Sequence, residues 1–322
     1  NITIKYSRPD VNGREGKIWG TLVTYGFTSQ NINTNKSDMP WRAGANETTM
    51  ITFEHDVKVE GKDIKAGTYG LYMAVWAEKA TIIFSKQADA WGSFFYEEKN
   101  DVLRVDVKPV ALDKSVEWLK YEFIEQREKY CVIALQWEKL SIPFRVDVDV
   151  DNIVLARMRE QVTGQRGFTP LLLTAAANYF INKKINLEEA LAWSQRAASF
   201  KSFSTLNTLG TAYTMLNKLK EADSTMNEAL VFANVGQYLN YGRNLIAAKR
   251  LDRALEVFNA SQKKNGDVFQ VNAGFMSYYS AKGDFQKALE YANKALAQAP
   301  EPQKAAVNTM IAKLKEGKDI NQ

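Results

Sequence analysis

Short alternating runs of apolar and polar residues fill the first half of the chain. In residues 102–107, for example, apolar and charged side chains alternate, which is typical of a strand with one buried face. Similar runs bounded by turn residues occur at 2–6, 49–53, 57–62, 68–74, 80–84, 116–123, 130–137 and 144–148. So many short strands predict an antiparallel β-sandwich or jelly-roll-like domain over residues 1–149. The polar, Asn-rich residues 28–40 predict a long loop.

From residue 151 the apolar positions change to the spacing of helices. Residues 150–170 predict a linking helix and a loop, with Asp149 or Asp151 capping the start of the helix. Beyond residue 170 an alanine recurs at intervals of 32, 32 and 34 residues, at Ala190, Ala222, Ala254 and Ala288. Seven residues after each of these stands another small residue, at Ala197, Ala229, Ser261 and Ala295.

A helix–turn–helix period of about 34 residues with small residues at fixed places is typical of tetratricopeptide repeats. Residues 171–322 therefore resemble a tetratricopeptide array of about four repeats with a capping helix. We expect a multi-domain chain, all-β at its start and an all-α solenoid at its end. The first helices of such repeats line a concave groove. Their register places eight side chains there: Tyr179, Asn182, Lys183, Asn207, Thr211, Arg243, Gln270 and Ser277. The resemblance implies a protein or peptide partner in this groove.

The amino-acid composition and the distribution of charge exclude several classes of function. The 322 residues include one Cys and one His, which excludes an internal disulfide framework, a thiolate zinc site and a multi-histidine metal site. No apolar run approaches the ~20 residues of a membrane span. Residues 1–150 hold 20 Lys/Arg against 22 Asp/Glu, whereas residues 151–322 hold 22 against 15. Because no run of five or six basic residues occurs, we expect this basic excess to be a solvated helical surface rather than a nucleic-acid site.

A succession of motifs in the first half resembles one family. They include Tyr6-Ser7-Arg8-Pro9, Lys17-Ile18-Trp19-Gly20, Trp41-Arg42-Ala43-Gly44-Ala45-Asn46-Glu47, Ala66-Gly67-Thr68-Tyr69-Gly70-Leu71-Tyr72 and Trp137-Glu138-Lys139-Leu140. In this order they resemble the domain of unknown function DUF2911. The resemblance implies a β-sandwich-like module common in Bacteroidetes, without an established activity, in a periplasmic, outer-membrane-associated or secreted protein. The chain begins at Asn1 rather than Met, which we interpret as a processed or truncated start.

The segment from Trp41 to Glu47 is the most site-like part of this half. The Trp41 ring suits stacking on a sugar or a proline, and Arg42 and Glu47 offer a forked donor and a carboxylate. One hypothesis is a ligand pocket made of Arg8, Trp41, Arg42, Asn46 and Glu47. The structural alternative, which we prefer, is that Arg42 and Glu47 form an ion pair that pins the loop while Trp41 plugs the end of the sandwich.

The remaining chemical candidates favour structural interpretations. We expect His55 to be a surface histidine in a turn and Cys131 to be a buried structural thiol. Asp147, Asp149 and Asp151 alternate and suit calcium, but a strand that leaves the sheet and caps the next helix is the preferred interpretation. We expect most of four further tryptophans to lie in the core: Trp76, Trp91, Trp118 and Trp137.

The sequence contains no phosphate-binding glycine loop, no Gly-x-Ser-x-Gly elbow and no His-Glu-x-x-His motif. We therefore expect no cofactor and no metal. The leading interpretation is a non-enzymatic envelope protein whose array contacts a protein or peptide and whose β domain holds a small ligand or a glycan. The alternative is an enzyme acting on a glycan or a peptide, with carboxylates such as Glu47 in the sandwich cleft.

Overall fold

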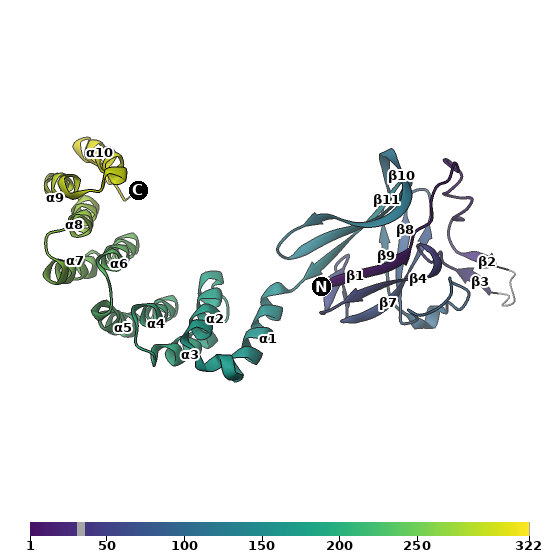
Figure 1. The fold of residues 1–322 in the computed structure, drawn as a ribbon, viewed down its shortest axis with the longest axis horizontal. Helices are drawn as coiled ribbons and strands as arrows, with labels where there is room; N and C mark the ends of the chain where they lie inside the picture. Colours follow the sequence, from purple (N-terminus) through teal and green to yellow (C-terminus); the bar gives the residue numbers. More distant parts are fainter. Residues whose placement is uncertain (31–35, 322) are drawn as a thin grey trace. The chain divides into compact units, whose positions relative to one another are not determined.

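The chain divides into two compact units. The computed structural model describes residues 1–30 and 36–321. Unit 1 is Asn1–Arg157 and unit 2 is Met158–Gln322, so the division falls within helix α1 (Val150–Thr163) (Figure 1). None of the helices in the described parts of the chain is long and apolar enough to span a membrane.

Unit 1 contains two large antiparallel sheets and one two-stranded sheet, and the two large sheets confirm the expected β-sandwich. The five-stranded sheet has the order β1 (Ile2–Ser7), β4 (Ala45–Phe53), β7 (Gly67–Val75), β8 (Ala80–Ser85) and β9 (Asp101–Val107). The four-stranded sheet has the order β10 (Val110–Gln126), β11 (Tyr130–Val148), β5 (Val57–Val59) and β6 (Lys62–Ile64). A short 3₁₀ helix, Glu98–Asn100, precedes β9.

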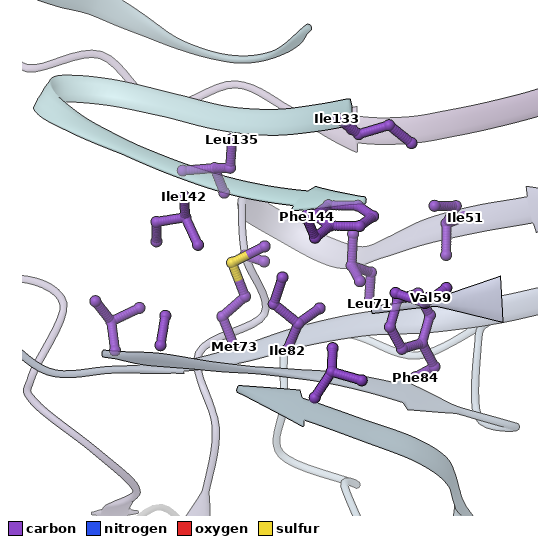
Figure 2. Close-up of a cluster of buried hydrophobic side chains, with 14 of the residues drawn as sticks. Ile51, Val59, Leu71, Met73, Ile82, Phe84, Ile133, Leu135, Ile142 and Phe144 are labelled. Atoms are coloured by element: carbon purple, nitrogen blue, oxygen red, sulfur yellow. The ribbon is translucent and has the colours of Figure 1, made fainter. Parts of the chain in front are cut away.

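The core of unit 1 lies between the inner faces of these sheets. Leu71 on β7 and Phe84 on β8 point toward Phe144 on β11, and all three are at most 1% exposed (Figure 2). Strand β8 is buried along its whole length. Its outer face is covered because Ile83 packs with Tyr72 and Tyr96 in a second, smaller cluster. Burial on both faces explains why β8 is a continuous apolar run rather than an alternating one.

Two features of unit 1 differ from the sequence prediction. The loop expected at 28–40 instead contains β2 (Thr28–Gln30) paired with β3 (Lys36–Met39); residues 31–35 of that prediction lie outside the described residues. Most residues of these two strands are polar, so no alternation of apolar and polar residues marks them in the sequence. The separate strands expected at 116–123, 130–137 and 144–148 are parts of the long strands β10 and β11, whose register shifts three times. Such bulges interrupt the alternation from which strand ends are predicted.

Unit 2 consists of helical hairpins, as predicted. The four hairpins are α2 (Pro170–Lys183) with α3 (Leu187–Ala198), α4 (Phe203–Met215) with α5 (Leu219–Val231), α6 (Val235–Ala247) with α7 (Leu251–Asn265), and α8 (Phe269–Lys282) with α9 (Phe285–Gln298). The last helix, α10 (Glu301–Lys315), packs on α9 at the expected capping position. Between α1 and α2 lies a short 3₁₀ turn, Gln165–Phe168.

Small residues allow the helices of unit 2 to approach closely. The four recurring alanines are at most 1% exposed, and the small residues that follow them are at most 2% exposed. Glycines serve the same purpose on the first helices. A Cβ atom at Gly242 would lie 2.2 Å from the Phe258 ring, and one at Gly274 would lie 2.6 Å from the same ring. The period found in the sequence is therefore a packing requirement.

Candidate functional site

Three tryptophans from distant segments form an aromatic cluster at one end of the sandwich. Trp41 exchanges two backbone hydrogen bonds of 2.8 Å with Met73 of β7, which fixes its position beside the sheet. Its ring stacks on that of Trp137 from β11 at a centroid distance of 6.1 Å. Trp19 contacts both rings edge-on, at 5.8 and 5.9 Å. The cluster joins the two sheets, and Trp137 is its buried member.

A cavity of about 280 Å³ opens beside this cluster. Trp41, Trp137 and Arg42 line it. The other lining residues are apolar, small or hydroxyl-bearing, and they include Pro9, Leu22, Val23, Thr24, Thr28, Pro40, Gly44, Ala45 and Ser93. Arg14 also lines the cavity, but its guanidinium donates to the carbonyl oxygens of Val11 and Asp10 at 2.8 Å and to the Asp10 carboxylate at 3.3 Å. Hydrogen bonds therefore hold the Arg14 side chain in place as part of the cavity wall.

Arg42 differs from Arg14 in having no partner. Within residues 1–30 and 36–321, Nε of Arg42 is buried without an acceptor, and the side chain makes no ion pair. Burial lowers the pKa of the Arg42 guanidinium because the charged form is desolvated. The cavity thus combines an aromatic wall with one unneutralised cation.

The backbone that carries Arg42 is strained and well supported. The next residue, Ala43, is fully buried and has φ = 52°, an uncommon conformation for a residue with a side chain. Its carbonyl oxygen accepts hydrogen bonds from the Thr49 hydroxyl at 3.1 Å and from the Tyr121 hydroxyl at 2.9 Å. A Cβ atom at Gly44 would lie 2.7 Å from the Thr49 hydroxyl oxygen, so a glycine is required there. These contacts hold the Arg42 backbone in one position.

The five residues of the ligand-pocket hypothesis do not all meet at this cavity. Trp41 and Arg42 line it, whereas Arg8, Asn46 and Glu47 are not among its lining residues. Arg8 donates from Nε to the carbonyl oxygen of Leu119 at 2.8 Å and so ties the end of β1 to β10. Asn46 is exposed at φ = 58°, and its carbonyl oxygen accepts from the Gly92 amide.

The predicted ion pair between Arg42 and Glu47 is wrong. The Glu47 carboxylate instead accepts from the Ser7 hydroxyl at 2.9 Å. The pKa of Glu47 lies below its ordinary value, chiefly because its carboxylate accepts a backbone hydrogen bond and secondly because it accepts the hydrogen bond from Ser7. The two side chains are close in sequence, but Arg42 lies at the cavity whereas Glu47 lies in the exposed first part of β4. Sequence proximity alone could not show this divergence.

Sequence reasoning missed most of the cavity wall. Pro9, Leu22, Ser93 and Trp137 come from four separate segments, and no motif links them. The expectation for the tryptophans was also wrong in part. Trp137 is 1% exposed, but Trp91 and Trp118 are 57% and 51% exposed, and Trp76 is half-buried. Composition identifies aromatic residues but does not show on which face of a bulged strand each one lies.

The remaining chemical candidates of unit 1 have structural surroundings. His55 is exposed in the turn between β4 and β5, as expected. Cys131 is half-buried on β11, and burial raises the pKa of its thiol. Asp147 pairs with Arg145 at 2.6 Å, and Asp151 pairs with Lys129 at 2.8 Å.

Asp149 is the N-cap of α1, since its carboxylate accepts from the Asn152 amide at 3.2 Å. The described residues contain no group of three or more His, Cys, Asp or Glu side chains placed to hold a metal ion.

In unit 2, the first helices of the hairpins, α2, α4, α6 and α8, follow one side of the array (Figure 1). Most of the predicted groove residues on these helices are half-buried or exposed: Tyr179, Asn182, Lys183, Asn207, Thr211, Arg243 and Gln270. Lys183 lies over the Tyr179 ring at 5.1 Å. Ser277 departs from this pattern because it is 2% exposed and its carbonyl oxygen accepts from the Asn321 side chain at 2.9 Å. The end of the chain covers α8 at this point.

Arg243 on α6 is the notable cation of these helices. Its side chain is half-buried, and burial lowers the pKa of its guanidinium. In contrast, Arg250 and Arg253 both pair with Asp223 of α5. No ion pair involves Arg243 in the part of the chain that the structure describes.

Comparisons with known proteins agree with this two-part description. Residues 1–146 match the family described as "Protein of unknown function (DUF2911)". No curated protein sequence matches the chain significantly.

Several solved structures resemble the helical part. A tetratricopeptide repeat protein from Parabacteroides merdae is 18% identical with a TM-score of 0.35, and the match covers 51% of this chain and 66% of that protein's chain. YrrB, titled a TPR protein with an unusual peptide-binding site, is 18% identical with a TM-score of 0.33, covering 51% and 86%. The APC/C complex Cut9–Hcn1 is 14% identical with a TM-score of 0.36, covering 52% of this chain but only 33% of its own.

At these TM-scores the likenesses add nothing to the assignment of the fold, which rests on the four hairpins themselves. The first 146 residues thus match a protein family of unknown function, DUF2911, and a tetratricopeptide-like helical array follows them.

Proposed function

We propose that this chain is a non-enzymatic binding protein whose helical array holds a protein segment and whose β unit holds a small ligand. Stacked helical hairpins support the first role because they form an extended surface along their first helices. The cavity beside Trp41 supports the second role because small-molecule sites combine apolar walls with a few placed polar groups.

One observation carries the proposal for the array, namely the unpaired Arg243. A half-buried guanidinium without an ion-pair partner is desolvated without compensation, and an acidic group from a partner would neutralise it. Asn207 and Thr211, on the preceding first helix α4, are half-buried side chains suited to hydrogen bonding with an extended backbone. The proposed partner is therefore an extended segment that presents Asp or Glu.

Binding of labelled peptides to the full chain tests this role. Fifteen-residue peptides containing Asp and Glu are compared with the same peptides carrying Asn and Gln, by fluorescence anisotropy at low salt. We expect the acidic peptides to bind and the Arg243→Glu variant to bind them at least tenfold more weakly, because a like charge replaces the attractive one. The affinity should also fall as salt is added.

A matched control separates a local effect from a general loss of positive charge. Lys220→Glu makes the same charge change at an exposed position on α5, the second helix of its hairpin. We expect this variant to bind like the wild type. Equal binding by wild type and Arg243→Glu, or preference for the neutral peptides, would contradict the proposal.

We also propose that the protein acts in the periplasm, at the outer membrane or outside the cell. The match to DUF2911 supports this proposal, since the resemblance implies an exported module. Fractionation of cells that express the native full-length gene tests it. Recovery of the protein solely in the cytoplasmic fraction would overturn the proposal.

A further inference from the structure

Two residues that line the cavity beside Trp41 carry a buried hydrogen-bond donor without an acceptor among the described residues, namely Nε of Arg42 and the indole nitrogen of Trp137. The indole nitrogen of Trp19, in the adjoining aromatic cluster, is a third such donor. Buried donors are normally satisfied, so each exception calls for a physical explanation. An indole N–H can use a neighbouring aromatic face as a weak acceptor, whereas a charged guanidinium calls for a stronger one. Arg42 is therefore the donor that indicates the chemical class of the ligand.

The unsatisfied charge is a property of this one arginine rather than of the whole cavity. Arg14 lines the same cavity and has its hydrogen bonds filled by the Asp10 carboxylate and by two carbonyl oxygens. Arg42 has no equivalent partner, and Glu47, five residues further along the chain, is bonded to Ser7 instead. Arg42 is half-buried, and its Nε is the buried atom that lacks an acceptor. Partial burial of a charge costs free energy unless an opposite charge reaches it. The natural complement of a guanidinium is an oxyanion that accepts two of its hydrogens.

The rest of the cavity restricts what the oxyanion is attached to. Trp41, Pro9, Pro40 and Leu22 give the wall an apolar part, beside the polar part formed by Thr24, Thr28 and Ser93. A small inorganic ion would leave the apolar part without a contact. The volume of about 280 Å³ is nearly twice that of a 150 Å³ cavity that binds benzene. A flat ring with a short charged side chain fits this space.

The strained loop keeps the backbone at Arg42 in place before any ligand arrives. The φ of 52° at Ala43 is maintained by the Thr49 and Tyr121 hydroxyls, both bonded to the Ala43 carbonyl oxygen. Strained backbone persists where the surroundings hold it, and it is concentrated at ligand-binding and active sites.

We infer that this cavity binds a small organic carboxylate with a flat aromatic body, with the carboxylate on Arg42 and the ring against Trp41, which Trp137 supports from within the core. The inference rests on the ligand role proposed above for the β unit. It goes further by naming the chemical class of the ligand and the residue that selects it.

Titration of the full chain with matched probes tests the inference. The probes are indole-3-acetate, its uncharged analogue indole-3-acetamide, and inorganic phosphate, with calorimetry as the readout. We expect the carboxylate to bind at least tenfold more tightly than the amide, and phosphate to bind weakly or not at all. Arg42→Gln should weaken carboxylate binding at least tenfold. Arg127→Gln, at the exposed turn between β10 and β11, should leave it unchanged.

The outcomes separate the two proposals. Equal binding of the amide and the carboxylate, or full binding by Arg42→Gln, overturns the carboxylate inference while the ligand site survives. If phosphate binds in an Arg42-dependent way and the aromatic carboxylate does not bind, the inference that the ligand has an aromatic body is overturned. Binding of none of the probes overturns the carboxylate inference.

The melting temperature of the unliganded Arg42→Gln variant provides an independent readout. Removing a half-buried charge without an ion-pair partner among the described residues should leave the melting temperature unchanged or raise it. A decrease would show that Arg42 has a stabilising partner and would overturn the inference.

Discussion

The indole of Trp41 stacks on the indole of Trp137, with the ring planes 17° apart and the centroids 6.1 Å apart. Ninety-six positions separate the two residues along the chain, and the contact joins the segment before β4 to strand β11. Trp41 is bonded through its backbone to β7 of the five-stranded sheet, so the pair connects the two sheets. The same pair forms a wall of the cavity that holds Arg42.

Truncating the buried member of this pair should destabilise unit 1. Trp137 is 1% exposed, and Trp137→Ala should lower the free energy of unfolding by about 3–5 kcal/mol, because it removes a large buried side chain and leaves a cavity. Six of the seven tryptophans lie in unit 1, so intrinsic fluorescence in a denaturant titration reports mainly on this unit. As a control, Trp91→Ala removes an exposed indole and should change the free energy by less than about 0.5 kcal/mol. Similar losses in the two variants would contradict the assignment of Trp137 to the core.

Adding a single methyl group at Gly242 should destabilise unit 2. A Cβ atom there would lie 2.2 Å from Phe258, so Gly242→Ala should cost about 1–3 kcal/mol through overpacking, even though alanine favours helix formation. Thermal unfolding followed by helical circular dichroism measures this cost. Gly236→Ala in the same helix is the matched control, because its nearest neighbour would be 3.4 Å away. An unchanged melting curve for Gly242→Ala would show that α6 and α7 are further apart than described.

Removing the N-cap of α1 should loosen the first turn of that helix. Asp149→Ala deletes the acceptor of the Asn152 amide and should cost about 1 kcal/mol. Hydrogen exchange of amides at the start of α1 should become faster, while amides in the core of the sandwich keep their protection. Asp149→Asn retains an acceptor and should restore slow exchange. Slow exchange in Asp149→Ala would mean that the cap contributes nothing.

Ionisation of Asp101 should make unit 1 less stable as pH rises. Oδ2 of Asp101 accepts from the Tyr96 hydroxyl at 2.7 Å and from Arg104 at 2.6 Å, but Oδ1 is buried without a partner among the described residues. Burial raises the pKa of this carboxyl above its ordinary value, despite the hydrogen bonds that oppose the change. A raised pKa in the folded state means that this group contributes stability below the ordinary carboxyl pKa of about 3.9, and that the contribution is lost as pH rises through the raised value.

The Asp101→Asn variant isolates this effect because it cannot ionise. The free energy of unfolding of the variant minus that of the wild type should increase as pH rises from the ordinary carboxyl pKa through the raised one. Denaturant titrations at a series of pH values measure this difference. A difference that is constant, or that decreases with pH, would show that the ion pair with Arg104 outweighs burial.

The architecture was predictable because it depends on regular spacing. Alternation along β1 and β9 reports a buried face, and the recurrence of Ala190, Ala222, Ala254 and Ala288 reports where paired helices must touch. These patterns are local or periodic, and the physical demand behind them is the same at every repeat. The DUF2911 motifs could be identified for a similar reason, since they occur in order along one stretch of chain.

By itself, then, the sequence determined the two-part organisation, the strand-rich first half, the helical hairpins, and the presence of Trp41 and Arg42 in one unusual segment. Only the tertiary structure decided that Arg42 is separated from Glu47, that Trp137 completes an aromatic wall, and that Arg14 is neutralised while Arg42 is not. The reason is physical. Pairing, burial and neutralisation depend on which distant segments meet, and bulged strands and irregular loops give no spacing from which such meetings can be predicted.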